Sequence, residues 1–336
     1  MTLPTVAVPT VVVIGTGGTI SGVGQDRLDL YEYGTTGRFM HVDELLATVP
    51  ELSRVATVKP VRYRNVPSTA LGPPDWLDLV RLVHQAAEDA PAGIVVTHGT
   101  ASLEETAYAL NLAVKTSIPV VVVGAMRPSS ALGADGGMNL LNAVRVAIDP
   151  ASRGMGVLVV LNDEINAARD VTKTSNYRLQ TFRTPDWGLL GHTDGDQVAF
   201  YRRPLRRAAP DTEFDVAGLA ELPRVDIIPT YAGADAALIH AAIAAGAQGL
   251  VCAGFPSGAP TPVQRTALVA AARQGTAVVQ ASRAGSGRVI GTKISLLEDG
   301  FIGADTLTPL KARILLMMAL TRTKDPEDLR RIFATY

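Results

Sequence analysis

Short apolar runs alternate with amphipathic stretches along the first half of the chain, and this alternation limits the possible folds more than any other feature. The runs are four or five residues long, and they cover residues 11–14, 94–97, 120–123 and 157–161. Between the first two, Leu79, Val80 and Val83 keep helical spacing behind a Pro-Pro pair that suits a helix start. Strands that alternate with helices predict a mostly parallel sheet covered on both faces, and therefore an α/β fold.

The alternation is interrupted between about residues 201 and 223, where arginine and proline are frequent, and then resumes. The resumed pattern predicts strands near residues 225–228, 249–252 and 277–280, and helices near residues 234–245, 262–274 and 309–320. A length of 336 residues suits two domains. We therefore predict a large N-terminal α/β domain over residues 1–205, a linker over residues 206–223 and a smaller C-terminal α/β domain over residues 224–336.

Charge and cysteine content exclude several classes of function. A formal net charge of −1 gives no electrostatic attraction to nucleic acid or to an acidic membrane. The one dense basic run, Arg202, Arg203, Arg206 and Arg207, is interpreted as a solvated connector. Cys252 is the single cysteine, and with five scattered histidines it offers no metal-ligand spacing, so neither a metal nor a cofactor is expected.

The start of the sequence bears on location. It has no basic segment of the kind that opens a signal peptide, and its apolar run at residues 11–14 is far too short to span a bilayer. We therefore expect a cytoplasmic protein with no membrane partner.

A glycine-rich loop follows the first apolar run. It spans residues 15–22 and holds four glycines, which allow tight turns and a close approach to a ligand. The dinucleotide fingerprint requires glycine at its sixth position, which from Gly15 is Ile20, so a nucleotide-dependent oxidoreductase is disfavoured. The loop presents two hydroxyl groups, those of Thr16 and Thr19. Taken alone, such a loop is more typical of a structural turn than of a nucleophile.

Two further loops carry polar residues at corresponding places. Thr100 follows the second run, just before a helix start that we expect Ser102 and Glu105 to cap. The amide groups at such a helix start favour anions. Lys173 lies in the loop after the fourth run. Ligands of open parallel sheets bind beyond the carboxyl ends of the strands, so these loops should converge, and this makes Lys173 a candidate base rather than an ordinary surface charge.

These loops resemble, in order along the chain, the signature blocks of bacterial-type L-asparaginases. The matching blocks are Thr16-Gly17-Gly18-Thr19-Ile20, His98-Gly99-Thr100 with Glu104-Glu105-Thr106, Gly124-Ala125-Met126-Arg127-Pro128 and Asp170-Val171-Thr172-Lys173-Thr174. The ending, residues 320–326, resembles that family too. The resemblance covers nearly the whole chain. It implies an amidohydrolase that cleaves the side-chain amide of a small molecule through an acyl-enzyme.

The resemblance also implies catalytic roles. Thr19 matches the nucleophile, and Tyr31 matches the tyrosine on a mobile loop that helps to activate it, with Tyr33 two residues away. Thr100 matches the second threonine and Lys173 its base. The chemistry suits these residue types, because a threonine hydroxyl must lose its proton as it attacks. A lysine accepts protons near neutral pH only when its pKa is depressed.

Substrate binding is implied for Ser68, Thr69, Gly99 and Ala101. Ser68 matches the serine that binds the α-carboxylate of the substrate. Ala101 stands where the family has an aspartate that pairs with the α-ammonium, and Thr69 stands where it has a glutamine.

Two further ammonium-side positions of the family also differ. An asparagine that reaches across the dimer aligns with Ser257. A glutamate from the neighbouring small domain aligns with Lys293, or less well with Glu298.

Three hypotheses follow from this combination of kept and changed residues. The first is an L-asparaginase-like enzyme. The second is a related amidase for a des-amino or N-blocked substrate, because every residue expected around the ammonium is changed. The third is a non-catalytic binding protein on the same scaffold, which would bind a ligand tightly without releasing ammonia. The resemblance further implies a homotetramer with its active sites at a dimer interface.

Overall fold

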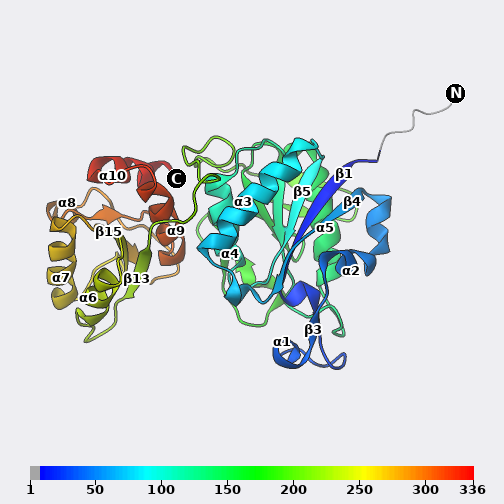
Figure 1. Ribbon diagram of the computed structural model, residues 1–336, viewed down its shortest axis with the longest axis horizontal. Helices are drawn as coiled ribbons and strands as arrows, with labels where there is room; N and C mark the ends of the chain where they lie inside the picture. The colour runs from blue at the N-terminus through cyan, green and yellow to red at the C-terminus, as the bar shows by residue number, and fades with distance from the viewer. Residues whose placement is uncertain (1–7) are drawn as a thin grey trace. The chain divides into compact units, whose positions relative to one another are not determined.

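The computed structural model describes residues 8–336, and the chain divides into two compact units between Asp211 and Thr212 (Figure 1). This division lies inside residues 206–223, the stretch that we interpret as a linker. Parts of that stretch pack on each unit: the Ala209 amide donates to the Asn111 carbonyl of the first unit, and Phe214 is fully buried in the second. Residues on either side of the division therefore pack on their own unit.

The first unit is built on an eight-stranded mixed sheet with strand order β12-β11-β8-β7-β6-β5-β1-β4. Five of its strands run parallel: β1 (Thr10–Gly17), β4 (Thr57–Val66), β5 (Gly93–Thr97), β6 (Val120–Val123) and β7 (Val157–Leu161). Three antiparallel strands complete it: β8 (Glu164–Ala167), β11 (Gly191–Thr193) and β12 (Val198–Phe200). The predicted mostly parallel α/β fold is confirmed.

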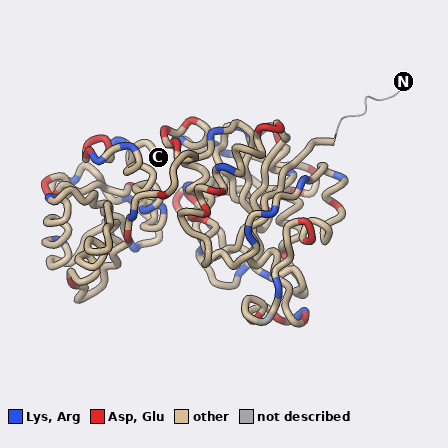
Figure 2. Tube along the Cα trace, in the orientation of Figure 1, with Lys and Arg blue, Asp and Glu red and all other residues tan. Residues whose placement is uncertain are grey.

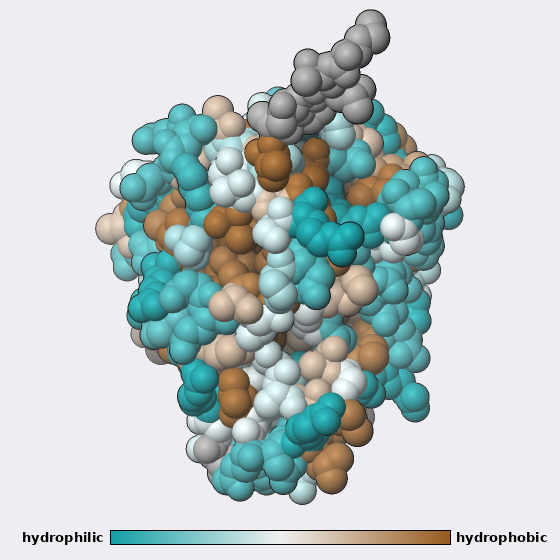
Figure 3. Space-filling model, turned by 90° about the vertical axis from the view of Figure 1, so that its right-hand side faces the viewer, coloured by the Kyte–Doolittle hydropathy of each residue, from teal (hydrophilic) through white to brown (hydrophobic). Residues whose placement is uncertain are grey.

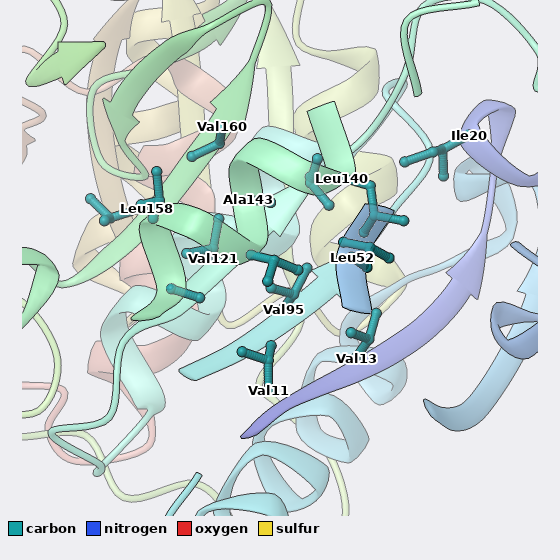
Figure 4. Packing of buried hydrophobic residues seen from close by; sticks show 14 of the residues in the cluster. Val11, Val13, Ile20, Leu52, Val95, Val121, Leu140, Ala143, Leu158 and Val160 are labelled. Atoms are coloured by element: carbon teal, nitrogen blue, oxygen red, sulfur yellow. The ribbon is translucent and has the colours of Figure 1, made fainter. Parts of the chain in front are cut away.

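Helices cover both faces of this sheet. They are α2 (Val42–Ala47), α3 (Pro73–Glu88), α4 (Leu103–Ala113) and α5 (Gly136–Ile148). Figure 1 places α3 and α4 on one face and α5 on the other. On the α5 face, Leu140 and Ala143 pack against strand residues such as Val95 and Val121 in a fully buried cluster (Figure 4). Burial of these apolar side chains supplies the main force that holds the layers together.

Strand β4 lies at one edge of the sheet, where unpaired backbone groups could recruit another strand. Three of its residues, Lys59, Arg62 and Arg64, form ion pairs with Asp89, Asp43 and Asp75. Figure 3 faces this side of the first unit and shows hydrophilic residues interspersed with apolar ones. Charged residues on the strand protect the edge against unwanted pairing.

Two small ribbons next to the main sheet carry residues of interest. Strand β2 (Gly22–Val23) pairs with β3 (Arg38–Phe39), and the segment between them contains the short helix α1 (Tyr33–Thr36). Strand β9 (Thr172–Lys173) pairs with β10 (Phe182–Arg183), so that Lys173 lies opposite Phe182. Neither ribbon follows from the apolar pattern, because each strand is only two residues long.

The second unit contains a four-stranded parallel sheet, in the order β13 (Val225–Pro229), β14 (Gly249–Gly254), β15 (Ala277–Ser282) and β16 (Ile302–Gly303). Its helices are α6 (Ala237–Ala244), α7 (Pro262–Arg273), α8 (Ile294–Glu298), α9 (Pro309–Leu320) and α10 (Pro326–Thr335). Cys252 is fully buried in β14, and burial raises the pKa of its thiol, which suits a packing residue. Figure 2 shows acidic and basic residues interspersed over each unit.

Candidate active site

The two threonine hydroxyls of the first loop have different environments. Thr16, at the end of β1, is fully buried, and its hydroxyl donates to the Thr97 carbonyl at 2.9 Å. Thr19 begins the short 3-10 helix Thr19–Ser21 and is half-buried. Its Oγ1 lies 2.8 Å from the Tyr33 hydroxyl. Thr16 therefore secures the loop to β5, whereas Thr19 presents its hydroxyl to a second polar side chain.

Two glycines allow three loops to meet at this point. Gly18 has a φ of +79°, and a Cβ atom there would lie 2.2 Å from the Gly99 Cα atom. A Cβ atom on Gly99 would lie 2.8 Å from the Ser68 Oγ atom. Any larger residue at either position would push the loops apart. The loop after β1, the loop after β5 and the turn that carries Ser68 are therefore in direct contact.

The tyrosine beside Thr19 is Tyr33, and the expectation that Tyr31 occupies this place is wrong. Tyr31 is 75% exposed. The Asp29 carboxylate accepts hydrogen bonds from the amides of Glu32 and Tyr33, at 2.8 and 3.0 Å, and this turn begins helix α1 at Tyr33. The ring of Tyr33 lies against Gly22, where a Cβ atom would be 2.9 Å from it. The capped turn thus points Tyr33 inward and leaves Tyr31 outside.

Thr100 and Lys173 form a second pair. The Lys173 ammonium donates to the Thr100 hydroxyl at 2.8 Å. Burial lowers the pKa of Lys173, and the nearby carboxylate of Glu104 raises it. His98, next to this pair in sequence, is fully buried, which lowers its pKa to about 4 and keeps its imidazole neutral at physiological pH. Lys173 is therefore a titratable group whose pKa lies below that of an ordinary lysine.

Both pairs open into one cavity of about 220 Å³. Its lining comprises Gly18, Thr19, Tyr33, Gly34, Phe39, Pro67, Ser68, Thr69, Gly99, Thr100, Ala101 and Lys173. Seven of the eight residues proposed from sequence line this cavity, and Tyr31 does not. Lys173 is the charged residue of this lining, and no aspartate or glutamate is among its described members. The cavity can thus hold a small polar molecule between two hydroxyl groups.

Ser68, the residue expected to bind the substrate carboxylate, is fixed by a hydrogen bond from the neighbouring loop. Ser68 is 3% exposed, and its carbonyl accepts a hydrogen bond from the Ser102 hydroxyl at 2.7 Å. The expected capping role of Ser102 is therefore wrong: helix α4 begins at Leu103 as predicted, but the Ser102 side chain bonds to Ser68 instead of capping the helix. Thr69 and Ala101 are exposed at the rim of the cavity.

Three lining residues that sequence analysis missed lie in or next to very short elements. Phe39 belongs to β3, Pro67 precedes Ser68, and Tyr33 begins α1. Their places depend on turns that have no apolar periodicity, so only the loop alignment around Tyr33 gave a signal.

The second unit holds the remaining candidates. Ser257 has a φ of +66° and is exposed. Lys293 is the N-cap residue of α8, Glu298 ends that helix, and both are exposed. Within residues 8–336, no group of three or more His, Cys, Asp or Glu side chains is arranged to hold a metal ion. In the same range no helix is long and apolar enough to cross a membrane.

Two family models match the chain. The N-terminal asparaginase model matches residues 10–206, and the glutaminase/asparaginase C-terminal domain model matches residues 224–333. L-asparaginase 2 of Bacillus subtilis (strain 168) is 43% identical over 331 residues, covering 98% of this chain and 87% of that protein. L-asparaginase 2 of Escherichia coli (strain K12) is 42% identical over 334 residues, covering 98% and 94%. The crystal structure of a probable cytoplasmic L-asparaginase from Campylobacter jejuni superposes with a TM-score of 0.93 at 37% identity, covering 98% of this chain and 100% of that one.

Proposed function

This chain belongs to the asparaginase family and is an amidohydrolase, and we propose that it hydrolyses a side-chain amide through an acyl-enzyme formed on Thr19. One observation carries the proposal: Thr19, 2.8 Å from the Tyr33 hydroxyl, lines the same cavity as Thr100, which is 2.8 Å from the Lys173 ammonium. A hydroxyl nucleophile needs a neighbour that takes its proton, and a second pair is available to activate water. The names of the relatives, L-asparaginases, support an asparagine-like substrate.

In the first half of the reaction, the Thr19 oxygen attacks the amide carbon, and its proton leaves along the hydrogen bond to Tyr33. The negative charge that develops on the amide oxygen is stabilised by the Thr100 hydroxyl and by loop amides. The C–N bond breaks, and the amino group takes up the proton that Thr19 lost, relayed by the Tyr33 hydroxyl, and leaves as ammonia. In the second half, water attacks the ester. Neutral Lys173 accepts the proton of that water through Thr100, and the carboxylate product is released from a regenerated Thr19 hydroxyl.

The two neighbouring tyrosines provide a matched test of the activating group. Tyr33→Phe should lower kcat at least about tenfold, because it removes the hydroxyl that contacts Thr19. Tyr31→Phe should leave kcat within about twofold, since Tyr31 is 75% exposed and outside the cavity. Ammonia release measured under saturating substrate distinguishes the two variants. A larger loss in Tyr31→Phe than in Tyr33→Phe would reverse our assignment.

A second candidate substrate class is favoured by the charges of the cavity. No carboxylate is among its described lining residues, and Ala101 is exposed at its rim. A desolvated ammonium without a partner is costly, whereas Ser68 remains in place for a carboxylate. An amide that carries a carboxylate but no free ammonium, such as succinamate or an N-acyl-asparagine, suits this lining.

A carboxylate introduced at position 101 should change the pH dependence of the reaction. A nearby negative charge favours the protonated form of lysine, so Ala101→Asp should raise the pKa of Lys173. Activity requires the deprotonated base, and therefore the rising limb of the rate profile should move to higher pH. The isosteric variant Ala101→Asn, which adds no charge, serves as the control. An Ala101→Asp variant that stays active with an unmoved limb would argue against Lys173 as the base.

The most informative experiment is an ammonia-release screen that compares asparagine, glutamine, succinamate and N-acyl-asparagine. Release from any of them supports the amidase. Tight ligand binding with no release from the whole panel would favour the non-catalytic scaffold instead. We further propose a cytoplasmic homotetramer with active sites at a dimer interface, and light scattering after size-exclusion chromatography measures the assembly.

A further inference from the structure

One carboxylate behind the cavity connects both members of the Thr100–Lys173 pair. Glu104 lies in the first turn of helix α4, which begins three residues after Thr100. Its Oε1 atom accepts a hydrogen bond from the Lys173 backbone amide at 3.1 Å and another from the Thr172 hydroxyl at 3.2 Å. Glu104 thereby attaches strand β9, which carries Lys173, to the helix next to Thr100.

Burial makes the charge of this carboxylate significant. Glu104 is only 6% exposed, and its Oε2 atom has no hydrogen-bond partner within residues 8–336. A buried carboxylate with an unpartnered oxygen is costly unless a cation lies close by. Glu104 is also the charged group whose field raises the pKa of Lys173. The charge of Glu104 therefore offsets part of the effect of burial on Lys173.

Two arginines on the segments next to Lys173 have carboxylate partners of their own. On the same segment, Arg169 contacts Asp170 at 2.8 Å. On β10, which pairs with β9, Arg183 contacts Glu164 at 2.9 Å. On the loop that carries Thr100, His98 is buried and neutral. Glu104 on α4 is thus the charge from a neighbouring element that bears on the Lys173 ammonium.

We propose that Glu104 is a positioning residue that holds Lys173 against Thr100 and, through its charge, keeps Lys173 a strong enough base. This inference rests on the proposed amidase function, in which Lys173 accepts a proton. Burial alone would lower the pKa of Lys173, and the Glu104 charge opposes that shift. The strength of a general base in the transition state increases with its pKa, so this opposition preserves the proton affinity of Lys173.

The variant Glu104→Gln removes the negative charge of the side chain but keeps its shape. It also keeps an Oε1 acceptor for the hydrogen bonds from Thr172 and Lys173 of β9. Without the negative charge the pKa of Lys173 falls, so the rising limb of kcat/KM should move to lower pH by about one unit. Glu104→Ala removes the attachment as well, and should lower kcat at least about tenfold at every pH. Glu105→Gln, one residue along the same helix, is the control and should leave the limb in place. An unmoved limb in a folded, active Glu104→Gln variant would overturn the proposal.

A measurement that needs no turnover keeps this test independent of the amidase assignment. The chain has six lysines, Lys59, Lys115, Lys173, Lys293, Lys311 and Lys324, so mass spectrometry can follow each one. The rate of carbamylation by cyanate reports the deprotonated fraction of each amine. In Glu104→Gln the half-point for Lys173 should move down by about one unit, with exposed Lys324 unchanged as internal reference. A moved half-point in a protein that hydrolyses no amide would sustain the coupling and reject the amidase, and an unmoved one would reject the coupling.

Discussion

Replacing Thr19 by alanine is expected to lower kcat by at least about a thousandfold, because the variant has no oxygen with which to form the acyl-enzyme. Thr19 is half-buried, and its side chain contacts the Tyr33 hydroxyl. The variant should therefore fold and melt at nearly the wild-type temperature. Single-turnover ammonia release, with a melting curve on the same sample, measures both effects. Retention of more than about a tenth of wild-type activity would contradict the assignment of Thr19.

Thr16, on the same loop, supplies a control whose replacement should lower stability but leave the chemical step intact. Thr16 is fully buried and donates to the Thr97 carbonyl, so Thr16→Val leaves that carbonyl without its partner. We expect a loss of about 1–2 kcal/mol of unfolding free energy. Folded Thr16→Val should still form the acyl-enzyme. The two hydroxyls lie three residues apart, and their substitutions should therefore separate loss of chemistry from loss of stability.

The parallel strands could be predicted from sequence because each is buried on both faces and reads as a continuous apolar run. Every residue of β5, β6 and β7 is buried, which leaves no polar position to obscure the pattern. The antiparallel strands could not be predicted in the same way. Strand β12 is three residues long and only partly buried, so its sequence carries little apolar periodicity.

Site residues could be predicted from the sequence where the order and direction of the strands alone determine their place. Thr19 and Thr100 follow separate parallel strands, and the topology of a parallel sheet brings such loops to one edge. Lys173 comes after the antiparallel strand β8, which returns the chain to the start of β7, so the family resemblance and not the parallel topology indicates its place. Tyr33 was not predictable, because two tyrosines stand two residues apart and only the Asp29 turn decides which one faces Thr19. The sequence indicates Glu104 only as a member of a block that resembles the family. Its contact with Lys173 depends on where β9 lies, which local sequence does not determine.

The preference of the enzyme among amides is expected to follow the charges of the cavity. Its described lining includes Lys173 and no carboxylate, so asparagine would place its ammonium there without a partner. Succinamate and N-acyl-asparagine keep a carboxylate for Ser68 and carry no ammonium. Desolvation of an unpaired ammonium costs more than about 1.4 kcal/mol, so kcat/KM for the better analogue should exceed that for asparagine at least roughly tenfold.

The substitution Ala101→Asp supplies the missing carboxylate at the rim and should shift the preference back toward asparagine. Ala101→Asn has nearly the same volume and no charge, and it should leave the preference as in the wild type. The ratio of kcat/KM values for succinamate and asparagine, measured on one preparation of each variant, cancels errors in active-enzyme concentration. Efficient wild-type turnover of asparagine, faster than that of either analogue, would show that the ammonium finds its partner outside this lining. Faster turnover of asparagine than of either analogue in Ala101→Asp, but not in the wild type, would establish that the residue at position 101 determines which amide this enzyme accepts.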